Sequence, residues 1–167
     1  AINVTTNNDT VIVKSGTYYE NVQIYQKNIV LGSEYVTTGD NSYISSTVIN
    51  GNFGTGPCIQ LTYVDSTCQV VGFNLNNGAP GIAVYDQSDG TSPLIKYCKI
   101  NNNYNYGIEA DGGNLKLVHC EISNNFGSGC MFRRGFKTVR NCKINSNSGH
   151  GLDSVSYTHL RAHETQR

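Results

Sequence analysis

The chain has 167 residues, of which only 14% are charged, with 12 basic and 12 acidic side chains in balance. A single elongated domain accounts for this length. Formal neutrality argues against a nucleic-acid partner, because a groove for nucleic acid needs clustered Lys and Arg. No run approaches the roughly 18 apolar residues of a membrane-spanning helix, so no membrane span is expected.

The amino-terminal third predicts short strands separated by glycine. β-branched runs occupy residues 11–13, 22–24 and 29–31, and such residues favour strands. Segment 33–42 is rich in Thr, Gly, Asp and Asn, which indicates a loop outside the regular structure. The sequence TVINGN at 47–52 resumes the strands, and CIQL and CQVVGFNL continue them.

From residue 70 onward the chain repeats. Cysteines stand 22 residues apart at 98, 120 and 142, within the copies KYCKINNNYNYGI, LVHCEISNNFGSGC and VRNCKINSNSGHGL, and VVGFNLNNGAPGI precedes them as a looser copy. A fixed period of this length is typical of a solenoid. Apolar residues alternate with period two, which indicates strands, whereas the Asn- and Gly-rich runs disfavour helices. Leu is too sparse for a leucine-rich repeat. We therefore predict an all-β parallel solenoid with about 22 residues per coil.

Stacking of the coils at about 4.8 Å would align equivalent residues in rows. The rows Ile100/Ile122/Ile144 and Cys98/Cys120/Cys142 are predicted to point inward. The row Asn103/Asn125/Asn147 is expected to turn a corner through side-chain hydrogen bonds, and Gly107/Gly129/Gly151 to permit a sharp bend. We expect buried free thiols for the cysteines, with a disulfide as the alternative. No CxxC pair supports a metal site.

The pattern V-x-V-x-x-G-T-Y-x-E-N-V from Val11, followed by KNIVLG and TVING, resembles the start of right-handed parallel β-helix proteins of the pectin lyase-like superfamily. The resemblance covers residues 9–154. It implies three parallel sheets wound into a right-handed prism, a secreted or cell-surface location, and frequent polysaccharide partners. Both inert and catalytic members share these repeats, so the resemblance is specific for the fold and weak for activity.

The regular pattern stops near the carboxyl end. We expect residues 1–155 to form a partial β-helix, truncated at both ends, with any signal peptide outside the fragment. Residues 156–167 are expected to lie outside the solenoid and to add no stability. The string VSYTHLRAHETQR resembles the peptide read from sequencing-adaptor DNA at the end of an environmental gene fragment.

Four charged residues form the candidate catalytic group: Glu109, Asp111, Arg133 and Asp153. If Ile108, Cys130 and Leu152 point inward, these four point outward. Glu109 and Asp153 would then lie two rungs apart, about 9.6 Å, near the upper limit for an inverting glycosidase pair. Asp111 beside Arg133 suits an acidic sugar, or Ca²⁺ in a lyase. The simpler interpretation, which we favour, is a solvated face whose opposite charges pair across rungs.

Four further residues are candidates for ligand binding. Tyr85, Tyr104 and Tyr106 are expected near the same face, where aromatic rings suit sugar stacking. His150, in Gly149-His150-Gly151, resembles the histidine motif of polygalacturonases. However, Pro80, Tyr106 and Ser128 hold its place in other coils, and the remaining signatures of polygalacturonases, pectin methylesterases and pectate lyases are absent.

These observations favour an extracellular or cell-surface β-helix that binds polysaccharide or a surface glycan, or serves as an adhesive or structural segment. No complete active site and no cofactor are expected in this interpretation. The alternative is a polysaccharide lyase or glycoside hydrolase acting on an acidic polysaccharide, with Ca²⁺ if it is a lyase.

Overall fold

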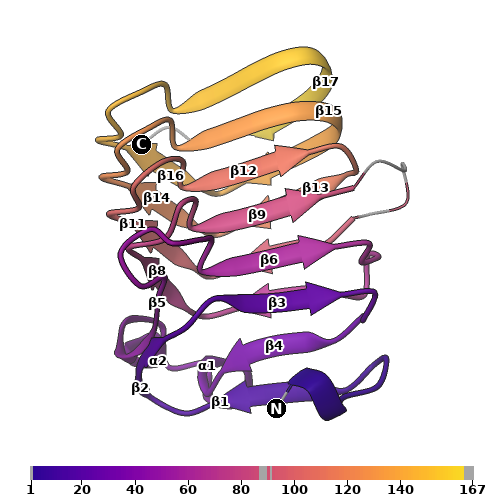
Figure 1. Cartoon of the computed structure of the whole chain (residues 1–167), viewed down its shortest axis with the longest axis vertical. Helices are drawn as coiled ribbons and strands as arrows, with labels where there is room; N and C mark the ends of the chain where they lie inside the picture. The colour runs from indigo at the N-terminus through magenta and orange to yellow at the C-terminus, as the bar shows by residue number, and fades with distance from the viewer. Residues whose placement is uncertain (1, 87–89, 91, 164–167) are drawn as a thin grey trace.

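The computed structural model describes residues 2–86, 90 and 92–163, with residues 156–163 described by their backbone alone. Short strands wind into a parallel β-solenoid of about 6 turns with about 23 residues per turn, and Figure 1 shows the turns stacked along the long axis. The predicted all-β solenoid is confirmed. The wider mean period reflects the early coils, which are longer than the 22-residue repeats.

The strands line three faces of the solenoid. The front face, toward the viewer in Figure 1, consists of β3 (Val22–Tyr25), β6 (Ile59–Thr62), β9 (Ile82–Tyr85) and β12 (Ile108–Asp111). The back face consists of β1 (Thr10–Val13), β4 (Val30–Ser33), β7 (Gln69–Val71), β10 (Leu94–Lys96) and β13 (Leu115–Val118). The side face consists of β2 (Gly16–Tyr19), β5 (Thr47–Asn50), β8 (Asn74–Asn76), β11 (Lys99–Asn101), β14 (Glu121–Ser123) and β16 (Lys143–Asn145).

Two long strands join the front and back faces. β15 (Cys130–Arg140) and β17 (Leu152–His163) continue through the corner between them, so the two faces share one 11-stranded sheet, and the side face is a separate 6-stranded sheet. The predicted three-sheet prism is thus present as three faces but two hydrogen-bonded sheets. The pairing of strands within each face is parallel.

Segment 33–42 differs from the predicted loop. It carries the short helix α1 (Tyr35–Thr38) and leads into α2 (Ser42–Ser46), while the 3₁₀ helix η1 (Ile2–Val4) precedes β1. Thr37 and Thr38 donate their hydroxyls to the carbonyl of Glu34, and Gly39 ends α1 in the left-handed conformation at φ 71°. These local bonds create a single helical turn that strand periodicity does not reveal.

The core lies inside the coil, as the rows predict. Ile100 and Ile122 are fully buried and pair across adjacent side-face strands. Ile144 is only half-buried because β16 is the outermost strand of its sheet. The cysteine row follows the same trend: Cys98 and Cys120 are buried, Cys142 is half-buried, and all six cysteines of the chain are free thiols.

The asparagine row connects successive rungs at the corner after the side face. The Asn125 amide group donates to the Ile100 carbonyl at 3.2 Å and to Asn147 Oδ1 at 2.8 Å. Its own Oδ1 accepts from the backbone N–H and the side-chain amide of Asn103, at 3.1 and 2.9 Å. Each asparagine therefore satisfies its own rung and the next one, which confirms the predicted corner role.

The glycine row has a different cause from the one expected. Gly107 and Gly129 do not adopt left-handed φ values. A Cβ at Gly107 would instead lie 2.6 Å from both the Gly129 carbonyl oxygen and a methyl group of Ile122. Glycine is required here because the chain passes too close to the next rung to admit a side chain.

At the carboxyl end, the backbone of β17 does not stop at the expected boundary of residue 155. It pairs in parallel with β15 as far as His163, with a register shift between Arg133 and Gly135. The free edge of β15 offers unpaired N–H and C=O groups, which any following chain satisfies by forming a strand. The side chains of 156–163 and all of 164–167 lie outside the described residues, so the assignment of this tail as foreign to the solenoid stays a prediction.

Replacing Asn125 by alanine should lower the free energy of unfolding by about 2–3 kcal/mol, because it leaves buried backbone and side-chain groups of two neighbouring rungs without partners. Urea denaturation measures the loss. The control is Asn145→Ala on the exposed surface of β16, which should change stability by no more than about 0.5 kcal/mol. Equal effects of the two substitutions would contradict the role given to the asparagine row.

Candidate functional site

The outward residues of the front face form the rows that the sequence predicts. Glu109 pairs with Met131, which pairs in turn with Asp153, and Asp111 lies opposite Arg133. The inward neighbours Ile108 and Cys130 are fully buried. The register of the candidate catalytic group is therefore confirmed, and the contacts of each side chain decide what it can do.

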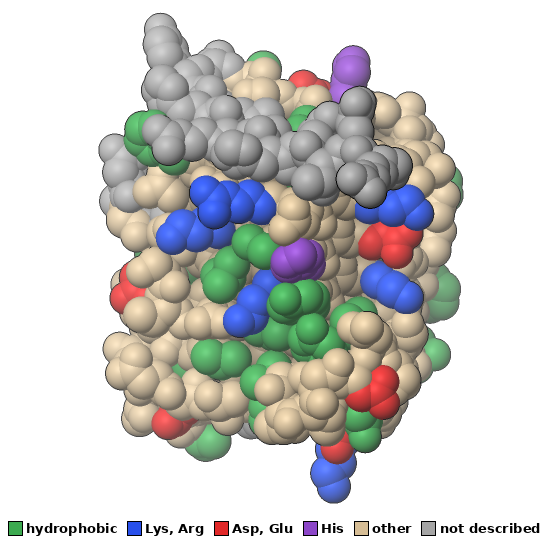
Figure 2. Space-filling model, turned by 180° about the vertical axis from the view of Figure 1, so that it is seen from behind, with side chains coloured by type: hydrophobic (Ala, Val, Ile, Leu, Met, Phe, Trp, Pro, Cys, Tyr) green, Lys and Arg blue, Asp and Glu red, His purple; other side chains and the backbone are tan. Residues whose placement is uncertain are grey.

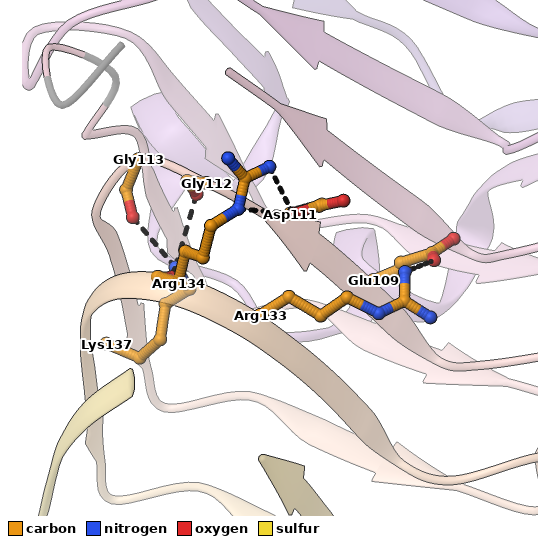
Figure 3. A network of polar contacts seen from close by, with 7 residues as sticks. All are labelled: Glu109, Asp111, Gly112, Gly113, Arg133, Arg134 and Lys137. Atoms are coloured by element: carbon orange, nitrogen blue, oxygen red, sulfur yellow. Dashed lines mark hydrogen bonds and ion pairs between the residues drawn. The ribbon is translucent and has the colours of Figure 1, made fainter. Parts of the chain in front are cut away.

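Glu109 is held from two sides. Its Oε1 accepts from Arg133 Nη1 at 2.9 Å, which is also an ion pair, and its Oε2 accepts from the Tyr85 hydroxyl at 3.2 Å. The Glu109 side chain is only 15% exposed, against 40% for Arg133. Figure 3 shows the Arg133 guanidinium directed at this carboxylate. Both carboxylate oxygens of Glu109 are thus engaged, and the arginine presents the more accessible surface.

The predicted association of Asp111 with Arg133 is wrong at the level of side chains. Asp111 Oδ1 accepts from Arg134 instead, from Nη2 at 2.7 Å and from Nε at 3.1 Å, as Figure 3 shows. Arg134 has φ 52°, and the register of β15 against β17 shifts between Arg133 and Gly135. Such an irregularity breaks the alternation of a strand, so two consecutive arginines reach the same face.

Asp153 does not join Glu109. Its carboxylate lies 3.8 Å from His150 Nδ1, and the His150 side chain is 80% exposed. The backbone N–H of His150 donates to Ser128 Oγ, so His150 sits in the turn position that Ser128 holds one coil earlier. The three carboxylates of the predicted catalytic group are therefore paired separately, two with arginines and one with a histidine.

Tyr85 has a perturbed titration. Burial, and then the negative charge of Glu109, raise the pKa of Tyr85 to about 12. The hydroxyl is therefore a permanent hydrogen-bond donor at neutral pH. Tyr85, Glu109 and Arg133 form a small polar cluster with one accessible cationic side.

The other tyrosines lie elsewhere, contrary to the expected cluster. Tyr85 ends β9 opposite Asp111, whereas Tyr106 precedes β12, so the two are separated by roughly 16 Å along the strand direction. The Tyr104 ring stacks on Phe126 with centroids 5.8 Å apart and an interplanar angle of 9°. This pair lies at the corner before the front face, and Phe126 was not among the predicted residues.

Lys137 is a buried charge that the sequence analysis missed. It is 1% exposed, and its ammonium donates to three backbone carbonyls, those of Gly112 at 3.2 Å, Gly113 at 2.8 Å and Arg134 at 2.6 Å. Lys137 pairs with Leu115 and so occupies an inward position of the solenoid. A signal was present in the sequence, because Lys137 lies one 22-residue period after Leu115.

The carbonyls around Lys137 belong to the corner where the chain leaves the front face. Gly112, Gly113 and Arg134 all have positive φ there, which turns their carbonyls away from the sheet. Burial lowers the pKa of Lys137 to about 8, although the nearby Asp111 acts in the opposite direction. Lys137 therefore stabilises the corner beneath Arg134 and has no access to a ligand.

Cavities and metal ligands give no support for catalysis on the front face. A cavity of about 460 Å³ opens at the amino-terminal end of the solenoid, between inward residues of the first coils that include Val11, Val22 and Leu31. Within the described residues, no group of three or more His, Cys, Asp or Glu side chains is arranged to hold a metal ion. Neither short helix in the described part of the chain has the length or apolar character to cross a membrane.

A family model described as the right handed beta helix region matches residues 1–166. The chain belongs to this family. The parallel rungs, the inward rows and the asparagine corner are the features of a right-handed β-helix, and the expectation drawn from the opening motif is confirmed.

Two solved structures are similar to this right-handed β-helix in fold. Both are of the pectin methylesterase from Aspergillus niger. The penultimately deglycosylated form has a TM-score of 0.50 and 13% identity, over 95% of this chain and 78% of that one. The deglycosylated form has a TM-score of 0.48 and 14% identity, over 93% and 76%. At these identities the likeness concerns the fold alone. A comparison with curated proteins gave no match.

Lys137 should make the stability of the β-helix depend on pH. Its pKa is lower in the folded state than the ordinary value of 10.5, so the unfolded state binds more protons between about pH 8 and 10.5, and stability attributable to this residue rises with pH across that window. The difference in unfolding free energy between wild type and Lys137→Met should therefore move in favour of wild type by up to about 3 kcal/mol. Chemical denaturation at pH 7 and pH 10 measures it. A difference that does not change with pH would contradict the lowered pKa.

Proposed function

We propose that this β-helix binds carbohydrate through the Tyr85, Glu109 and Arg133 cluster of the front face, without cleaving it. The observation that carries the proposal is the double engagement of Glu109, by Arg133 and by Tyr85. A glycosidase needs one carboxyl group free to donate a proton and a second free to act as base or nucleophile. Here each carboxylate already has a partner.

The exposed side of the cluster suits recognition of sugar hydroxyls and carboxylates. Arg133 retains guanidinium N–H groups beyond the one that contacts Glu109, and Arg134 is half-exposed beside it. Arginine presents a planar set of donors that matches carboxylate oxygens in pairs. The Tyr104 and Phe126 rings, 48% and 66% exposed, add an apolar surface at the corner before the front face, and sugars stack on such surfaces.

The proposal includes the location of the protein. A β-helix that binds polysaccharide or surface glycan meets its ligand outside the cell or at the cell surface. An adhesive or structural role would use the same contacts, because a stack of rigid coils can display such a surface without any chemistry.

The second candidate is a lyase or hydrolase acting on an acidic polysaccharide. The adjacent Arg133 and Arg134 favour it, since paired cations would neutralise the carboxylate of a uronic acid and so ease removal of the neighbouring proton. Asp111 would have to release Arg134 before it could bind Ca²⁺ or act as a base. For this reason the binding function ranks first.

The test is a screen of the purified protein against polygalacturonate, alginate and neutral glycans, with and without Ca²⁺. Binding is followed by affinity electrophoresis, and cleavage by the absorbance of unsaturated sugar ends and by reducing ends. We expect binding without product. Arg133→Gln should weaken binding about ten-fold, because it removes charge-assisted hydrogen bonds, whereas Lys14→Gln, on an exposed turn of the first coil, should have no effect.

Two variants separate binding from catalysis. Glu109→Gln removes the predicted acid, and the control Glu121→Gln removes a carboxylate of the side face that pairs with Lys143. Product formation by wild type that is lost in Glu109→Gln or Asp111→Asn and retained in Glu121→Gln would overturn the non-catalytic proposal. Absence of binding to every glycan would overturn the binding proposal itself.

A further inference from the structure

A column of polar and aromatic side chains lines the edge between the back and side faces. Each coil turns there through one residue with a positive φ, namely Gly72, Tyr97, His119 and Asn141, at 79°, 55°, 54° and 52°. The residues directly after the last three are the inward cysteines of the ladder. Because inward and outward positions alternate around this bend, the turning residue projects from the edge into solvent.

The aromatic members of the column stack along the solenoid axis. The Tyr97 and His119 rings are parallel within 4°, with centroids 5.0 Å apart, and Tyr35 lies 5.0 Å from Tyr97 on the other side at 46°. Tyr35 comes from α1 and fills the place that Gly72 leaves open, since a Cβ on Gly72 would lie 2.9 Å from the Tyr35 Cβ. Asn141 continues the column through a 3.4 Å contact between its amide and His119 Nε2.

Cationic side chains flank the column on both faces. Lys96, Lys116 and Arg140 come from β10, β13 and β15 on the back face, and Lys99 and Lys143 come from β11 and β16 on the side face. Figure 2 shows this side of the molecule, with a histidine among hydrophobic side chains and lysine or arginine on either side. The sequence contains the arrangement twice, as Lys-Tyr-Cys-Lys at 96–99 and Arg-Asn-Cys-Lys at 140–143.

The charges of this edge are poorly compensated. Glu121 is the one acidic residue lining the groove beside His119, and it pairs with Lys143 at 3.4 Å. Lys99 donates to a neutral partner, Ser45 Oγ, at 2.8 Å. Lys96, Lys116 and Arg140 form no ion pair with any residue that the structure describes. A surplus of positive charge therefore remains, although the whole chain is neutral.

Two shallow grooves meet at Tyr97. One, of about 250 Å³, runs past Tyr97, His119 and Asn141 toward Lys99 and Lys143. The other, of about 260 Å³, lies between Tyr35, Val36 and Lys96 and also reaches Tyr97. The column extends over four rungs, or about 14 Å at the strand spacing, which is the shape of a track for a chain and not of a pocket for a small molecule.

We propose that this edge binds an acidic polysaccharide laid along the solenoid axis. The rings of the column cover one another's faces, so their edges, which carry the positive end of the aromatic quadrupole, are turned outward. Ring edges, the His119 and Asn141 side chains and the flanking cations together suit carboxylate or sulfate groups repeated along a polymer. The site is separate from the front-face cluster and does not depend on it.

The same geometry disfavours single-stranded nucleic acid. Proteins that bind single strands offer free aromatic faces on which bases stack. Here both faces of Tyr97 are already covered, by Tyr35 and His119. A sugar chain has no such requirement, because its anionic groups can reach the cations while its hydroxyls contact the ring edges.

The test measures binding of the full chain to polygalacturonate, dextran sulfate, neutral dextran and a single-stranded oligonucleotide at low salt. We expect binding to the two acidic polysaccharides alone, weakened as salt screens the charges. The double variant Lys96→Gln/Arg140→Gln should bind about four- to 25-fold more weakly, at about two- to five-fold for each exposed cation. His119→Ala should also weaken binding, by removing a ring from the centre of the column.

Matched controls keep the result specific to this edge. Lys14→Gln makes the same change of charge elsewhere, Tyr19→Ala removes an exposed ring from β2, and Arg133→Gln alters the front face; none should change the part of the binding that the double variant removes. Circular dichroism verifies that each variant is folded. A double variant that binds as wild type does, an equal loss in Lys14→Gln, or tighter binding of the oligonucleotide than of polygalacturonate would overturn the proposal. A preference between carboxylated and sulfated polymers identifies which anion the site takes.

Discussion

The whole structure depends on hydrogen bonding from one rung to the next. No coil of about 23 residues can bury its inward side chains alone, so every coil relies on the coils above and below it. The asparagine row shows the constraint most clearly. Asn125 uses its amide and its carbonyl oxygen at once, on the rung before and the rung after. A shift of one residue in the register would break these bonds and turn the inward row outward.

This constraint assigns separate roles to the side chains of each coil. Inward positions must be apolar or fully hydrogen-bonded, and Lys137 is accepted there because three carbonyls surround its ammonium. Outward positions and corners are released from packing, so chemistry can vary there from coil to coil. The front face uses that freedom for ion pairs across rungs, and the edge between the back and side faces uses it for stacked rings and unpaired cations.

The two surfaces differ in how their charge is spent. On the front face each carboxylate lies beside a cation, so the net field is small and recognition must come from directed hydrogen bonds. On the opposite edge the cations outnumber the acidic groups, and attraction acts over a longer range until salt screens it. One solenoid can thus present a short-range and a long-range surface to the same polymer, or to two different ones. Similarity to a pectin methylesterase in fold does not decide between these uses, because unrelated functions share this architecture.

The sequence by itself determined the features that repeat. A period of 22 residues, an alternation of two within it, and identical residues in equivalent places were enough to predict the parallel solenoid, the inward isoleucines and cysteines, the asparagine corner and the register of Glu109, Met131 and Asp153. Repetition makes such predictions reliable because neighbouring coils are in contact by construction.

Only the tertiary structure decided the contacts that break the repeat. Arg134 reaches Asp111 because β15 is irregular at that residue, and regular alternation would have directed its side chain away. Tyr35 meets Tyr97 across 62 residues of chain because a helical turn in an irregular segment fills the space above Gly72. Tyr85 and Tyr104 are separated because they stand at opposite ends of their strands. Periodicity specifies which coil a residue belongs to and which way an ideal strand would point it; the partner of a long side chain depends on the bulges, corners and excursions that periodicity does not contain.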